Sequence, residues 1–140
     1  MKNILVVFAL LTLTPVAVFA TATQTRPPQA VLEAFQKACP NAEDVDWELE
    51  YGMYEAEFEI GGIEQSATFT VAGYLLETEV EIAVSELPAA VRDYVAAHYK
   101  GKKIKEAARI ITAKKTVAYE VEVKRRDLMF DEQGNLLTGK

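Results

Sequence analysis

The chain has 140 residues and a formal net charge of −6; half of its residues are hydrophobic and about a quarter are charged. This composition is typical of a globular protein and excludes a disordered one, and the length suffices for one domain or for two small repeats that share a core. The acidic balance argues against a nucleic-acid partner. The single cysteine, Cys39, excludes an internal disulfide, so a hydrophobic core must stabilise the fold.

The N-terminus has the features of a secretory signal peptide. A lysine precedes the apolar run Ile4–Leu13, and both Val18–Ala20 and Ala20–Ala22 fit a small-x-small cleavage site. We therefore predict a signal peptide over residues 1–20, cleaved after Ala20 or Ala22, and a periplasmic or secreted protein. A membrane anchor is the alternative, but the longer stretch Ile4–Ala22 contains Thr12, Thr14 and Pro15, and a basic stop-transfer flank is missing. After cleavage we expect no stable membrane insertion.

The first half of the remaining chain predicts one helix followed by four strands. Residues 21–27 form a flexible polar segment, and a helix begins at Pro28 and ends before Pro40. Alternation of apolar and polar residues then predicts antiparallel strands joined at glycine-containing turns. These strands cover Val45–Tyr51, Met53–Ile60, Ile63–Val71 and Tyr74–Ile82.

The second half predicts the same order of elements. Pro88 begins a second helix, which ends at Gly101. Strands follow at Ile104–Thr112, Val117–Lys124, Leu128–Asp131 and Asn135–Leu137. The segments Pro28–Val31 and Phe69–Leu76 parallel Pro88–Val91 and Phe130–Leu137, about sixty positions on. We therefore predict one domain over residues 28–137, made of two repeats, 28–82 and 88–137.

These elements predict an α+β fold, a tandem repeat of a helix plus four antiparallel strands. Two such units side by side give one antiparallel sheet with two helices packed on one face. The other face would then carry alternating Glu and Lys residues. Trp47, Phe58 and Phe69 are expected in the core between sheet and helices.

Two tyrosines are candidate binding residues. Tyr51 and Tyr74 lie beside Gly52 and Gly73, which places them at hairpin tips. Exposed aromatic residues at turns suit a pocket on a partner protein. The alternative is a structural role, in which both tyrosines contribute to packing.

The charges divide unevenly along the chain. Residues 21–87 contain fourteen acidic and two basic residues, a net charge of −12, whereas residues 88–140 contain seven acidic and twelve basic residues, a net charge of +5. The two halves could attract each other across a shared sheet, or the charges could be solvated faces. Alternatively, the bipolar surface could steer a partner.

A catalytic site is not indicated. A Ser-His-Asp or Cys-His catalyst would require His98, the single histidine. Cys39 and His98 fall at the ends of the two helices and could approach if the helices packed side by side; otherwise His98 caps or lines its own helix. One His and one Cys are too few for a zinc site, and Glu55, Glu57 and Glu59 form a solvated row along a strand. We predict no catalytic residue, metal or cofactor, and no enzyme.

The order of these motifs resembles a known family. The pattern is a Pro-x-x-Val helix, then Val45-x-Trp47 with Gly52-x-Tyr54-x-Ala56-x-Phe58, then Phe69-x-x-x-Gly73-x-Leu75. It resembles the PepSY-like, β-lactamase-inhibitor-like secreted bacterial proteins over Pro28–Leu137. The resemblance implies a long, curved antiparallel sheet whose open face can grip another protein. It does not carry over inhibitory residues, because no motif matches the contact loops of the inhibitor.

We therefore expect a non-catalytic binding module that engages another envelope protein through the open sheet face and the hairpin tips. The alternative is a sensory module that captures a small molecule or a cell-envelope ligand between helix and sheet. A pocket needs unfilled core volume, and the bulky Trp47, Phe58 and Phe69 argue against one.

Overall fold

The computed structural model describes residues 26–139 as two helices, a 3₁₀ turn and eight strands. The predicted signal peptide, residues 1–20, lies outside the described residues, as does most of the segment 21–27. The elements in chain order are α1 (Gln29–Ala38), β1 (Glu43–Glu50), β2 (Met53–Ile60), β3 (Ile63–Thr70), β4 (Leu75–Glu81), η1 (Val84–Glu86), α2 (Ala89–His98), β5 (Ile104–Thr112), β6 (Val117–Val123), β7 (Arg126–Asp131) and β8 (Leu136–Gly139).

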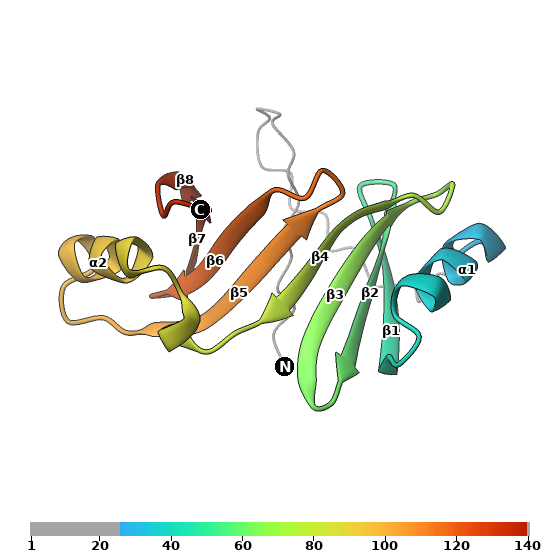
Figure 1. Ribbon diagram of the computed structural model, residues 1–140, viewed down its shortest axis with the longest axis horizontal. Helices are drawn as coiled ribbons and strands as arrows, with labels where there is room; N and C mark the ends of the chain where they lie inside the picture. The colour runs from blue at the N-terminus through green and yellow to red at the C-terminus, as the bar shows by residue number, and fades with distance from the viewer. Residues whose placement is uncertain (1–25, 140) are drawn as a thin grey trace.

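All eight strands form one open antiparallel sheet, and their order in the sheet is their order in the chain. Neighbouring strands are mostly joined by short turns, while η1 and α2 connect β4 to β5 (Figure 1). The predicted α+β class and the predicted antiparallel strands are confirmed, because period-2 alternation and glycine turns determine both. Strands β1 and β8 form the two edges of this sheet.

Both helices pack on the same face of the sheet. Residues that pair directly across strands share a face. One such row connects the ring of Phe58, which contacts α1, with the ring of Phe130, which contacts α2. The row runs through Phe58, Gln65, Val80, Arg109, Tyr119 and Phe130. The helices lie at opposite ends of the sheet (Figure 1), so they do not pack side by side.

Each helix packs an apolar face, which begins with a buried valine, against its own hydrophobic cluster. Val31 and Phe35 are buried on α1, and Val91 and Val95 occupy the equivalent places on α2. The cluster under α1 contains Phe58 and Phe69, both buried, with the partly buried Trp47 packed against it. The prediction that these three aromatic residues belong to the core is therefore confirmed.

Two glycine turns lie directly against the first turns of the helices. A Cβ atom on Gly73 would stand 2.5 Å from the carbonyl oxygen of Ala30, and one on Gly134 would stand 2.6 Å from the Cβ of Ala90. Both glycines also have positive φ angles, 84° and 85°. Each turn therefore requires glycine for its backbone conformation and for close approach to a helix.

Candidate functional site

The face of the sheet opposite the helices, called the open face here, is strongly acidic in the first half of the chain. Strand alternation and register place on it Asp46, Glu48, Glu50, Glu55, Glu57, Glu59, Glu64, Glu77, Glu79 and Glu81. The expected glutamates lie on this face, but strands β1–β4 contain no basic residue, and basic residues lie instead in turns such as Lys114-Lys115 and Lys124-Arg125. In the second half, Lys105 does reach this face, 2.6 Å from Glu106 and 3.4 Å from Glu122.

Three glutamates of the open face are buried. Glu55 on β2 and Glu79 on β4 are each 8% exposed, and Glu120 on β6 is 5% exposed. The prediction that Glu55, Glu57 and Glu59 form a solvated row is therefore wrong: Glu55 is buried and the other two are half-buried. Strand β2 is an interior strand, so residues of β1 and β3 flank these side chains on both sides.

This burial changes the acid–base behaviour of the face. Burial raises the pKa of Glu79 to about 9, and the negative charges of Glu120 and Glu55 add to the rise. Burial also raises the pKa of Glu55 to about 7, although a hydrogen bond from Ser66 acts in the opposite direction. Desolvation and like charges both disfavour the ionised form, so Glu79 is protonated at neutral pH.

A small apolar centre lies beside these glutamates. Ile110, Ala118 and Met129 form a buried cluster on the open face. Ile110 pairs with Glu79, and Met129 pairs with Glu120. The sequence contains a signal for this centre, since residues 107–111 place apolar residues on both faces of β5. This signal was missed because the other strands alternate apolar and polar residues.

The two predicted binding tyrosines stand at one rim of the sheet. Tyr51 lies in the β1–β2 turn and is 79% exposed; Tyr74 lies after the β3–β4 turn and is 73% exposed. The register places both turns at the same end, because Met53 pairs with Glu50 on one side and with Thr70 on the other. Val71, also exposed, adds apolar surface at this rim. A binding role for these tyrosines stays a prediction.

A family model described as "Putative beta-lactamase-inhibitor-like, PepSY-like" matches residues 52–138, which is more than half of the chain. The chain belongs to this PepSY-like family. The match extends from the β1–β2 turn through β8. It indicates no catalytic family. The comparison with curated proteins finds no match.

Solved structures support the same assignment. A BLIP-like protein from Bacteroides fragilis is 28% identical, with a TM-score of 0.67, over 83% of this chain and 86% of that chain. A "putative periplasmic" protein from Bacteroides eggerthii is 19% identical, with a TM-score of 0.75, over 83% and 89% of the two chains. A DUF2874 family protein from Bacteroides ovatus is 22% identical, with a TM-score of 0.72, over 83% and 88%. The latter two show a shared fold.

In the PepSY-like fold, Cys39 and His98 are separated. Cys39 follows α1 and packs against the first-half cluster, and burial raises the pKa of its thiol. His98 stacks on Tyr94 at 4.0 Å, and its Nδ1–H donates to the Tyr94 carbonyl at 2.9 Å. The two residues belong to helices at opposite ends of the sheet (Figure 1), so they form no dyad. As predicted, His98 lines its own helix.

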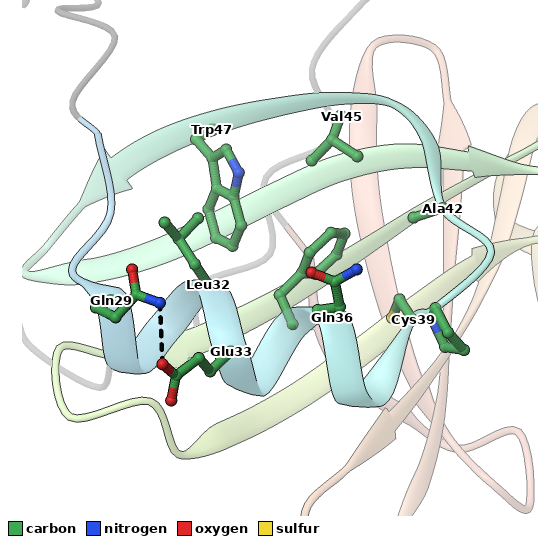
Figure 2. Close-up of a pocket in the computed structure, with 10 residues that line it drawn as sticks. Gln29, Leu32, Glu33, Gln36, Cys39, Ala42, Val45 and Trp47 are labelled. Carbon is green, nitrogen blue, oxygen red and sulfur yellow. Dashed lines mark hydrogen bonds between the residues drawn. The ribbon is translucent and has the colours of Figure 1, made fainter.

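A cleft that the sequence did not predict opens between α1 and the edge strand β1. It has a volume of about 440 Å³, and its apolar walls include Leu32 and Phe35 from α1 and Val45 and Trp47 from β1. Figure 2 shows Trp47 and Val45 across the cleft from Leu32 and Cys39. The bulky aromatic residues argued against a pocket, but α1 packs over β2 and β3 and leaves its outer flank open at this edge. Among residues 26–139, no helix has the length and apolar character needed to cross a bilayer.

Proposed function

We propose that this PepSY-like protein is a non-enzymatic binding protein of the periplasm or the secreted space, which engages another protein through the open face and its tyrosine rim. One observation carries the proposal: both described helices pack on one face, so no described helix covers the opposite face of the eight-stranded sheet. That surface combines an apolar centre with surrounding charge, the usual anatomy of a protein interface. The family description as inhibitor-like supports it.

The charge of the open face indicates a basic partner. Glu79 is buried, and this burial together with the negative charges of Glu120 and Glu55 raises its pKa to about 9. A lysine or arginine of a partner placed beside it would favour the ionised form and lower this pKa. Binding should therefore release a proton at neutral pH, and affinity should increase between pH 7 and pH 9.

Export and repetition complete the proposal. The periplasmic description of the Bacteroides eggerthii neighbour supports export through the signal peptide 1–20, which N-terminal sequencing of the exported protein would test by showing a start after Ala20 or Ala22. We also propose that residues 28–82 and 88–137 are two copies of one unit. The equivalent places of Gly73 and Gly134 against their helices support this relation.

A crosslinked pull-down tests the binding function. The tagged, exported protein is mixed with envelope extract from its own source, and captured proteins are identified by mass spectrometry. We expect one dominant partner, with a basic surface, that is lost when Tyr51 and Tyr74 are both replaced by alanine. Ile63→Ala is the matched control, because Ile63 is an exposed apolar residue at the opposite end of the sheet. Equal capture by all three proteins would remove the tyrosine rim from the proposal.

A small-molecule ligand is the second candidate, favoured by the cleft of about 440 Å³ between α1 and β1. This volume lies within the range of roughly 300–1,000 Å³ that is usual for ligand sites. Native mass spectrometry of the protein from its own periplasm would detect such a ligand. A bound mass that disappears in a Leu32→Trp variant, which fills the cleft, would establish this function.

A further inference from the structure

The outer edge of β1, beside the α1–β1 cleft, presents backbone groups with which no described strand pairs. A two-residue turn joins Glu50 to Met53, so this pair is hydrogen-bonded and the pairs alternate from it along the strand. Trp47 and Leu49 therefore occupy the non-hydrogen-bonded positions, and their N–H and C=O groups point away from β2. No other described strand pairs with β1 on that side.

The side chains of the same two residues face the helix layer. Trp47 lines the cleft together with Leu32 of α1, and Leu49 is exposed next to it. A strand added to the edge would place every second side chain on the helix face. Those side chains would enter the space under the outer flank of α1, where Figure 2 shows Leu32 and Gln36. The backbone edge and the cleft thus form one site.

The charge of β1 restricts which strand can bind. Five of its eight residues, Glu43–Glu50, are acidic, and the alternation places Asp46, Glu48 and Glu50 on the open face. Like charges that face each other across a strand pair are destabilising, so a second β1 is a poor partner. A strand with basic residues at alternate positions would instead complement this row.

We propose that the β1 edge binds an extended segment of another protein in which apolar and basic residues alternate, so that the sheet gains a ninth strand. The apolar side chains fill the α1–β1 cleft, the basic side chains lie against the acidic row, and the backbone pairs with Trp47 and Leu49. This is β-strand addition. The site goes beyond the proposed use of the open face, because neither rim tyrosine takes part in it.

A synthetic peptide of seven alternating lysine and valine residues is the probe. Trp47 is the single tryptophan of the chain, so its fluorescence reports binding directly. We expect a saturable emission change and slower hydrogen exchange at the amides of Trp47 and Leu49. N-methylation of the peptide at the pairing positions should weaken binding about tenfold or more, because it removes backbone hydrogen bonds. Equal binding of the methylated peptide would overturn the proposal.

Charge variants separate the β1 edge from general attraction. Asp46→Lys on β1 should weaken peptide binding about fivefold, whereas Glu81→Lys, the same charge change on an interior strand of the same face, should have little effect. A peptide with glutamate in place of lysine should bind the Asp46→Lys protein better than the original protein, which shows that the variant is folded. Equal losses in both variants would indicate non-specific attraction and reject the site.

Cys39 allows a chemical test of the cleft, because it is the single cysteine and lines the cleft. Alkylation with N-ethylmaleimide should weaken binding of the peptide, whereas a Cys39→Ala protein treated in the same way should bind the peptide with normal affinity. Unchanged affinity after alkylation would exclude the cleft. A Tyr51→Ala/Tyr74→Ala protein should bind the peptide normally, so failure of this proposal and failure of the open-face function are distinguishable.

Discussion

The two halves of the molecule use the same backbone devices but fill them with different side chains. In the first half, Phe35 is packed edge-on against Trp47 at 5.1 Å and Phe58 at 5.2 Å. In the second half, the buried residues are mainly aliphatic around Phe130. The glycine turn against the helix is nonetheless present in both halves. Glycine contacts and strand register thus define the scaffold, while the packing of each core is free to differ.

The largest expected effect is removal of the central phenylalanine of each core. Phe69 and Phe130 are both fully buried, so Phe69→Ala and Phe130→Ala should each lower the free energy of unfolding by about 3–5 kcal/mol. The loss should be greater for Phe69, because its ring contacts both Phe35 and Trp47 at 6.2 Å, whereas Tyr94 at 5.3 Å is the aromatic neighbour of Phe130. Urea unfolding measures both. A greater loss at Phe130 would show that the additional aromatic contacts of Phe69 do not make the first-half core the more stable of the two.

The glycine turns come next. Gly73→Ala and Gly134→Ala should each cost about 2–3 kcal/mol, since alanine is strained at positive φ and its Cβ would clash with the helix. Gly73→Ala should cost more, because its clash is with a backbone oxygen that cannot rotate away. Gly62→Ala is the control: φ is 77° there but no atom lies within 4 Å of the added Cβ. Equal losses at all three positions would mean that helix contact contributes nothing.

The sequence predicted the strands and helices well because alternation, turn glycines and Pro-x-x-Val starts are local signals. It did not predict the burial of Glu55, Glu79 and Glu120, since alternation assigns a residue to a face without showing what covers that face. It also missed the cleft beside Trp47, which depends on where α1 lies across the sheet. Whether Cys39 approaches His98 depended on the same placement, and the width of an eight-stranded sheet separates the two helices.

The acidic first half should make stability depend on pH. The pKa values of Glu79 and Glu55 are raised in the folded state to about 9 and about 7. The folded protein therefore binds more protons than the unfolded chain above the ordinary carboxyl pKa, and stability falls as the pH rises from about 4.5 to about 9. Urea unfolding at pH 5, 7 and 9 measures this slope.

Glu79→Gln should remove much of that slope and raise the free energy of unfolding at pH 9 by about 1–3 kcal/mol, because a neutral amide has no charge to desolvate. Glu122→Gln is the matched control from the second half. It loses an ion pair with Lys105 at 3.4 Å, which should change stability little, because the lysine is exposed and solvent screens the pair. A lower stability of Glu79→Gln at pH 9 would show that the buried carboxylate is compensated.

The smallest effect concerns two equivalent turns. Gly61-Gly62 joins β2 to β3, and Lys124-Arg125 joins β6 to β7; all four residues have positive φ angles. This geometry is that of a type I′ turn, which favours Asn-Gly. Replacing Lys124-Arg125 by Asn-Gly should therefore raise the free energy of unfolding by about 1 kcal/mol. The same replacement of Gly61-Gly62 should change it little, because glycine already fits. Thermal unfolding compares the two. If the replacement in the second half does not raise the free energy of unfolding, Lys124 and Arg125 are not strained. If it does, two basic side chains are kept at a turn despite a cost in stability, which favours a surface role for the positive half of the molecule.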